Sequence, residues 1–302
     1  MSTPVFIGGF RSGSTLLINL LGLHPEIAPW FETKELCEAL RWLRVLTNPA
    51  VFSEEAALMQ PIHPAGFDAA AVAARMRWHV DYNFRRLSGA EASGKAAYER
   101  YPLGADCILY SREEALQAVR RWELQADTTD LQRIGQVTGW LIRFLGKRQA
   151  ELMGRPLWIN KTPEISRFGD VLWDSLGPCR VILLIRNGWD VVRSAAALGW
   201  GDVGKLSQWW KGLIVQSRKV AREGYYLEIR YENLVDRPEE TLWTVLRFLN
   251  LPQDNDDVFF QRCRAQMMFG NQRARHSCCF HEADRAIFDR VAADLMHSLG
   301  YH

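Results

Sequence analysis

A short apolar segment near the N-terminus runs into a glycine-bounded loop and then into a leucine-rich stripe. The segment is PVFIGGFRSGST, Pro4 to Thr15, and the leucines that follow it lie at helical spacing. A loop that leads from a strand into the N-terminus of a helix presents backbone N–H groups and the positive end of the helix dipole. This part of the chain therefore predicts a strand, an anion-binding loop and a helix.

The loop has the spacing of the P-loop, which binds phosphates in many nucleotide-binding proteins, with one departure. Gly8 and Gly13 are the two spaced glycines, but Ser14 stands where the P-loop has a lysine. Arg11 lies two residues before the second glycine. The strand before the loop and the apolar helix after it are the context that this motif requires. We therefore expect a phosphate-binding site without the usual lysine.

Four short β-rich segments are separated by helical patterns: Pro4–Gly8, Leu157–Lys161, Val181–Arg186 and Tyr226–Tyr231. The third, VILLIR, is apolar at both alternating sets of positions, which fits a strand buried on both faces of a parallel sheet. Alternating strands and helices are typical of an α/β fold. We expect a P-loop-like parallel sheet flanked by helices.

Helix-start signals follow these strands. One helix is expected from Ser14, one from Thr162, where a capping threonine precedes a proline, and one near Asp190. A fourth is expected after Asp236-Arg-Pro-Glu239, which has capping-box spacing. Each signal places a helix shortly after a predicted strand.

Between about residues 36 and 154, helical stripes dominate and strand signals are weak. Ser111 and Glu114 have capping-box spacing at the start of one of these helices. Neither an internal repeat nor a low-complexity linker divides the chain. We expect a single domain over residues 1–302 with a helical insertion at about 36–154.

The composition excludes several classes of protein. A formal net charge of +2 over 302 residues does not indicate a nucleic-acid-binding protein. The six cysteines lack CxxC spacing, and no apolar segment reaches the roughly 18 residues of a membrane span. Arg11 interrupts the apolar N-terminal residues, so they do not predict a signal sequence. We expect a cytoplasmic protein with no integral membrane segment and no nucleic-acid partner.

The sequence lacks a second feature of nucleotide sites that use magnesium. In P-loop nucleotide hydrolases an aspartate, normally at the end of an apolar strand, helps to hold Mg²⁺. Here the apolar segment VILLIR ends in Arg186, and a cation at that point suits a phosphate better than a metal ion. A P-loop kinase that uses Mg-ATP remains one alternative function, and a non-catalytic nucleotide-binding protein is another.

Four ordered blocks of the sequence resemble those of the sulfotransferases that use 3′-phosphoadenosine 5′-phosphosulfate (PAPS). The blocks are FRSGSTLL, INKTP, LLIRNGWDVVRS and IRYENLVDRPEETLWTVLRFLNLP, and the resemblance covers about residues 4–35 and 156–252. It implies that PAPS is the co-substrate, that 3′-phosphoadenosine 5′-phosphate (PAP) is the product, and that no metal is needed. It also accounts for the missing lysine, because this donor has no β/γ-phosphate pair.

The resemblance carries over to individual residues. It implies that the 5′-phosphosulfate is bound by Arg11, Ser12, Gly13, Ser14 and Thr15. Arg186 and Ser194 match the pair that binds the 3′-phosphate, and Tyr231 is expected near the nucleotide. In the family a basic loop near the C-terminus covers the nucleotide, and Arg273 or Arg275 is the candidate here.

The segment HPEIAPWFETKEL resembles a block of the tyrosylprotein sulfotransferases and their bacterial relatives, in which a glutamate is the general base. It places Glu32 at that position, with Glu35 as the alternative, and Lys161 matches a lysine close to the bridging oxygen of the leaving group. The histidine base of cytosolic small-molecule sulfotransferases is absent from the NKTP block. The implied reaction transfers a sulfuryl group to an acceptor hydroxyl or amine.

The identity of the acceptor stays open at this point. A small molecule, a carbohydrate, a lipid or a peptide would all enter through the helical region, and Trp30 and Phe31 belong either to the acceptor pocket or to the core. HSCCFH, His276 to His281, contains metal-ligand residue types but no standard spacing, so no metal site is expected there.

Overall fold

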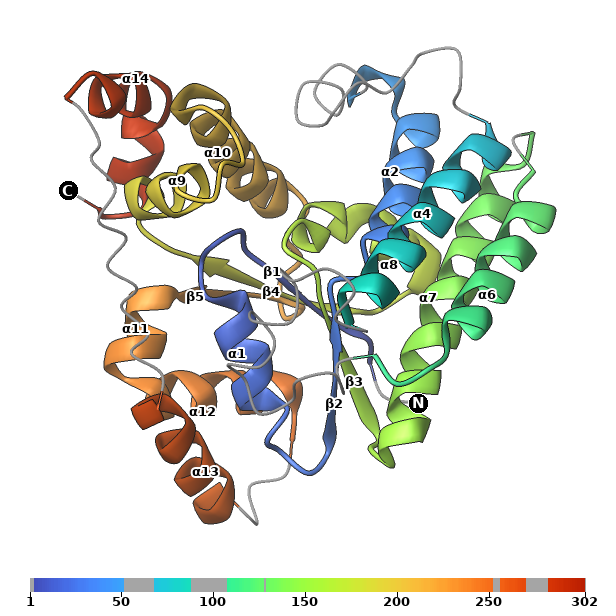
Figure 1. Ribbon diagram of the computed structural model, residues 1–302, viewed down its shortest axis with the longest axis horizontal. Coiled ribbons are helices and arrows are strands. Elements are labelled where there is room, and N and C mark those ends of the chain that lie inside the picture. Colours follow the sequence, from blue (N-terminus) through green and yellow to red (C-terminus); the bar gives the residue numbers. More distant parts are fainter. Residues whose placement is uncertain are drawn as a thin grey trace.

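The computed structural model describes residues 3–51, 68–87, 108–127, 129–251, 256–269 and 282–301. Within them lies a five-stranded parallel sheet with helices on both faces (Figure 1). Its strands are β1 (Val5–Gly8), β2 (Ile27–Phe31), β3 (Leu157–Lys161), β4 (Arg180–Ile185) and β5 (Tyr226–Arg230), in the order β2-β3-β1-β4-β5. The predicted α/β class, a parallel sheet flanked by helices, is confirmed.

Four of these strands match the predicted segments to within one residue at each end, whereas β2 was not predicted. Its sequence, IAPWF, contains Pro29, which argues against a strand inside a sheet. However, β2 is an edge strand, and the Pro29 carbonyl accepts a hydrogen bond of 2.9 Å from Gln149 Nε2 rather than from β3. In a strand the nitrogen and the carbonyl of one residue point to the same side, so the Pro29 nitrogen also faces away from β3. The missing N–H of the proline therefore costs the sheet no hydrogen bond.

A group of helices packs beside β2 and β3 (Figure 1). It comprises α2 (Lys34–Thr47), α4 (Ala69–Leu87), α6 (Arg112–Gln125), α7 (Leu131–Met153) and α8 (Gly169–Leu176), with short 3₁₀ helices at η1 (Pro49–Val51) and η4 (Ile165–Phe168). The capping box at the start of α6 is confirmed. The Glu114 backbone N–H donates to Ser111 Oγ over 3.1 Å, and the Glu114 carboxylate accepts a hydrogen bond from the Ser111 backbone N–H. That these helices form an insertion within one domain over residues 1–302 stays a prediction.

The remaining helices cover the two faces of the sheet around β4. They are α1 (Ser14–Leu21), α9 (Gly188–Ala196), α10 (Val203–Lys219), α11 (Tyr231–Asp236), α12 (Pro238–Leu249), α13 (Asp256–Phe269) and α14 (Glu282–Ser298). Ile182 and Leu184 pack into a core with α1 and α12, whereas Leu183 and Ile185 pack into a core with α9, α10 and α14. Strand β4 is thus buried on both faces, as its sequence predicted.

Two local predictions were wrong. The helix expected from Thr162 does not begin there, because Thr162 is buried and its hydroxyl donates to Asn160 Oδ1 over 3.1 Å. The chain instead forms η4 and then α8. The capping box at Asp236 is also absent, since α12 begins at Pro238 and Arg237 occupies the capping position without a side-chain hydrogen bond.

Candidate functional site

The loop after β1 wraps into a tight turn before α1. Gly9 and Gly13 have φ values of 121° and 85°, and Arg11 is also left-handed at 49°. Ser14 Oγ donates to the Gly9 carbonyl over 2.8 Å, and Ser12 Oγ donates to the Phe10 carbonyl over 2.9 Å. The two hydroxyls thus stabilise the conformation of the loop, and its backbone N–H groups and Arg11 are the groups suited to bind an anion.

Glycine at position 13 is required by a close neighbour as well as by its backbone angle. A Cβ atom on Gly13 would lie 2.4 Å from the ring of Tyr231, the first residue of α11. Such a distance is far below van der Waals contact, so only glycine lets the loop and Tyr231 approach this closely. The sequence had placed Tyr231 near the nucleotide, and the structure places it against the loop.

Arg186 and Ser194, which come from the end of β4 and from α9, converge on the same loop. Arg11 Nε donates to Ser194 Oγ over 3.1 Å, and Arg186 Nη1 donates to the Arg11 carbonyl over 3.3 Å. The Arg186 guanidinium lies 4.5 Å from the centre of the Tyr231 ring, and its buried Nε has no hydrogen-bond partner among the described residues. Residues from three separate sequence blocks therefore form one cluster.

Glu32 and Lys161 meet at the end of the neighbouring strands. Phe31 at the end of β2 is in register with Lys161 at the end of β3, and Glu32 N–H donates to the Lys161 carbonyl over 2.7 Å. The side chains then form an ion pair, with 2.8 Å between Lys161 Nζ and Glu32 Oε1. On its other side Lys161 is in register with Ile7 of β1, just before the loop. Lys161 thus stands between the loop and Glu32.

Two residues of α4 complete this arrangement and were not found from the sequence. Arg86 Nη1 lies 3.3 Å from Glu32 Oε2, and Asn83 Nδ2 donates to the Glu32 carbonyl over 3.0 Å. The second contact holds Glu32 at a φ of 44°, which is unusual for a non-glycine residue. No motif marks Asn83 or Arg86, because α4 lies outside the recognised blocks.

The two candidate bases, Glu32 and Glu35, have opposite electrostatic environments. Burial opposes the ionisation of Glu32, but attraction and hydrogen bonding from Lys161, with further attraction from Arg86 and Lys34, outweigh it and lower its pKa to about 2. Burial raises the pKa of Glu35 to about 8. Glu35 accepts a 3.3 Å hydrogen bond from Asn83 Nδ2. At neutral pH Glu32 is therefore a carboxylate and Glu35 a carboxylic acid.

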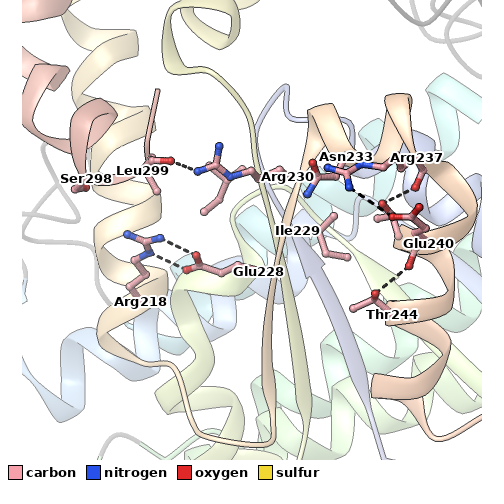
Figure 2. A pocket seen from close by; sticks show the side chains of 12 residues that line it. Arg218, Glu228, Ile229, Arg230, Asn233, Arg237, Glu240, Thr244, Ser298 and Leu299 are labelled. Carbon is pink, nitrogen blue, oxygen red and sulfur yellow. Dashed lines mark hydrogen bonds and ion pairs between the residues drawn. The ribbon is translucent and has the colours of Figure 1, made fainter. Parts of the chain in front are cut away.

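A cavity of about 410 Å³ lies along the outer edge of β5, between α10 and α12 (Figure 2). Four of its charged side chains form two ion pairs, since Arg218 lies 2.7 Å from Glu228 and Arg237 lies 3.6 Å from Glu240, and Arg230 donates to the Leu299 carbonyl. The residues predicted to form the functional site do not line this cavity. The candidate site is therefore the cluster at the ends of β1 to β4 and not this cavity.

Several other expectations concern residues in or near this region. Trp30 and Phe31 are buried in the core, and Trp30 Nε1 donates to Tyr110 Oη over 2.8 Å. Arg273, Arg275 and the segment 276–281 lie outside the described residues. In the part of the chain that is described, no three His, Cys, Asp or Glu side chains are grouped to hold a metal ion. No helix within the same ranges is both long and apolar enough to cross a membrane.

Three solved structures of sulfotransferases align with this chain. The sulfotransferase STF9 from Mycobacterium avium is 11% identical, with a TM-score of 0.51 and coverage of 100% of this chain and 78% of that chain. The sulfotransferase domain from the curacin biosynthetic pathway is 16% identical, with a TM-score of 0.49 and coverage of 100% and 98%. The sulfotransferase domain of the Synechococcus PCC 7002 olefin synthase is 18% identical, with a TM-score of 0.49 and coverage of 100% and 96%.

At these identities the STF9 match shows a shared fold. A comparison with curated protein sequences gives no match. A model of the sulfotransferase family, however, matches residues 4–256, which is most of the chain and includes the loop, Glu32, Lys161, Arg186, Ser194 and Tyr231. The chain therefore belongs to the sulfotransferase family.

Proposed function

We propose that this protein transfers a sulfuryl group from PAPS to an acceptor hydroxyl or amine. The observation that carries the proposal is the position of Lys161 between the loop after β1 and the carboxylate of Glu32. A group-transfer site needs a leaving-group stabiliser beside the donor and a base on the acceptor side. Lys161 and Glu32 supply these two groups within 2.8 Å of each other.

The donor would be held by the cluster around the loop. Backbone N–H groups at the start of α1 and the Arg11 guanidinium suit the 5′-phosphosulfate. Arg186 and Ser194 suit the 3′-phosphate, and the buried Nε of Arg186 is a donor without a partner among the described residues. Tyr231, beside both Gly13 and Arg186, supports the two halves of this donor site.

The proposed transfer step uses these positions. The acceptor oxygen attacks the sulfur atom, the bond between sulfur and the bridging oxygen breaks, and PAP departs with the electron pair. Glu32 takes the acceptor proton, while Arg11 and Lys161 offset the negative charge that grows on the departing phosphate. A sulfated acceptor and PAP are the products.

Lys161 also connects donor binding with the basicity of Glu32. A carboxylate with a pKa of about 2 is a weak base at neutral pH. The donor phosphate gives Lys161 a second anionic partner, which weakens its hold on Glu32 and raises the pKa of the carboxyl. Glu32 then becomes a better base when the donor is in place.

The test is transfer from PAPS to a panel of small-molecule, carbohydrate, lipid and peptidyl acceptors, with mass spectrometry to detect the gain of one sulfuryl group. Transfer that survives EDTA is the expected result. A kinase would instead use Mg-ATP and lose activity with EDTA, and a non-catalytic protein would bind PAP but modify no acceptor. Either of those results would contradict the proposal.

A further inference from the structure

One face of α4 forms a ladder of polar contacts with the segment that runs from Glu32 into α2. Three carboxyl groups spaced three residues apart meet side chains of α4 in order. Glu38 is contacted by Arg75 at 2.9 Å and by His79 at 3.2 Å, Glu35 by Asn83 at 3.3 Å, and Glu32 by Arg86 at 3.3 Å. We call this set the α2–α4 ladder.

The carboxylates at the two ends of the ladder differ in their access to solvent. Glu38 is 6% exposed, although its partner Arg75 is 40% exposed, and their ion pair serves the packing of α2 on α4. At the other end the side chains of Glu32 and Arg86 are 23% and 17% exposed. The pair between Glu32 and Arg86 is therefore one that a small ligand can reach, and it involves the candidate base.

Arg86 poses a chemical difficulty for that base. It occupies Glu32 Oε2 while Lys161 occupies Oε1, and both cations favour the ionised carboxylate over the protonated one. The donor phosphate attracts Lys161, but it does not draw Arg86 away from Oε2 of Glu32. A proton can move to Glu32 readily only if a second anion also competes for Arg86.

We propose that Arg86 binds a carboxylate of the acceptor, so that the acceptor is a hydroxy acid whose acid group lies near the reacting hydroxyl. The acceptor carboxylate takes the place of the Glu32 carboxylate, which is the same chemical group, so the exchange preserves the guanidinium–carboxylate pair. The Tyr82 ring, centred 5.4 Å from the Arg86 guanidinium, supports that group on α4. The inference rests on the proposed sulfuryl transfer.

The experiment uses pairs of hydroxy acids and their primary amides, which match in shape and differ in charge. Aromatic and aliphatic pairs in which the hydroxyl lies close to the acid group, such as 2-hydroxyphenylacetate and 3-hydroxydecanoate with their amides, are titrated into the enzyme–PAP complex by calorimetry. For at least one pair the acid should bind roughly tenfold or more tightly than its amide. Arg86→Met should abolish that preference, while Arg85→Met, an exposed neighbour on the same turn, should keep it.

Transfer assays with PAPS provide the second readout. In the wild type kcat/KM should be higher for the acid than for its amide. In Arg86→Met this preference should disappear, because the acid loses its cationic partner. The amide should gain, because Glu32 is no longer paired with Arg86. If Arg86→Met fails to fold, Arg86→Lys keeps the charge but not the planar fork, and it should reduce the preference without removing it.

The two proposals fail in different ways. In one outcome, acids bind more tightly than amides through Arg86 but receive no sulfuryl group. This result would support the carboxylate site and contradict the transfer reaction. Acids and amides that bind equally in every pair, or a preference that survives Arg86→Met, would overturn the inference whether or not transfer occurs.

Discussion

Arg11 Nε donates a 3.1 Å hydrogen bond to Ser194 Oγ, and this bond joins the loop after β1 to helix α9 after β4. In the proposed donor site these two residues serve opposite ends of PAPS. Ser194 Oγ accepts the bond from Arg11 and keeps its own O–H to donate to the 3′-phosphate, while Arg11 has other N–H groups for the 5′-phosphosulfate. The two ends of the donor site are thus connected before any ligand binds.

The first prediction concerns Arg186 and the choice of nucleotide. Arg186→Ala should weaken PAP binding by roughly 10- to 100-fold, because a charge-assisted hydrogen bond contributes about 1.5–3 kcal/mol. Adenosine 5′-phosphosulfate, which lacks the 3′-phosphate, should change little. Calorimetry with both ligands on both proteins measures the difference. Equal losses would mean that Arg186 only supports the loop through its bond to the Arg11 carbonyl.

The second prediction separates the conformation of Gly13 from its contact with Tyr231. Gly13→Ala adds a Cβ atom 2.4 Å from the Tyr231 ring, so the loop must move and PAP binding should weaken strongly. Gly154→Ala is the matched control, since Gly154 also has a positive φ of 65° but no atom within 4 Å of the added Cβ. The control should lose only roughly 1–2 kcal/mol of stability from backbone strain and bind PAP normally.

Thermal melting and PAP titration of both variants check this prediction. A Gly13→Ala protein that binds PAP as tightly as the wild type would show that the loop after β1 is not the donor cradle.

Most of the sheet was predictable because its strands are strongly apolar and begin or end at marked positions. Strand β2 was missed since Pro29 normally excludes a central strand, and only the sheet order reveals that it lies at an edge. This miss matters for the site. The pair of Glu32 and Lys161 follows directly from the register of Phe31 with Lys161, which cannot be stated until β2 is known.

The contacts of Glu32 with α4 were beyond sequence reasoning for a different reason. Asn83 and Arg86 lie three residues apart on an amphipathic helix, where polar residues usually indicate a solvated face. Only the packing of α4 on α2 turns that face toward carboxyl groups. The prediction of a helix from Thr162 was wrong for a similar reason. The capping pattern depends only on neighbouring residues, whereas the Thr162 hydroxyl forms a buried hydrogen bond with Asn160 in the folded protein.

The third prediction is a pH dependence of stability that originates in Glu35. The unfolded carboxyl loses its proton near pH 4.5, while burial keeps the folded one protonated up to about pH 8. Between these values unfolding releases a proton, so the contribution of Glu35 to stability is complete below pH 4.5 and is lost as the pH rises toward 8.

Glu35→Gln removes this proton release. The stability of the wild type relative to Glu35→Gln should therefore fall by about 1.4 kcal/mol per pH unit between pH 5 and pH 7. Urea unfolding of both proteins at several pH values gives the difference, in which contributions from other groups cancel. A difference that does not change with pH would mean that Glu35 is ionised in the folded protein.

The last prediction concerns Glu32 as the base. Glu32→Gln keeps the volume but removes the proton acceptor, so turnover should fall by roughly 10²–10⁴-fold. PAP affinity should not decrease, because the donor cluster uses other residues and Lys161 loses only a competing partner. The melting temperature should fall, since Lys161 is only 1% exposed and loses its carboxylate partner, so activity is measured well below the transition. Glu35→Gln is the matched control and should retain turnover, because Glu35 is already protonated at neutral pH. A Glu32→Gln enzyme with normal turnover, or a Glu35→Gln enzyme that alone is inactive, would assign the base to the other residue.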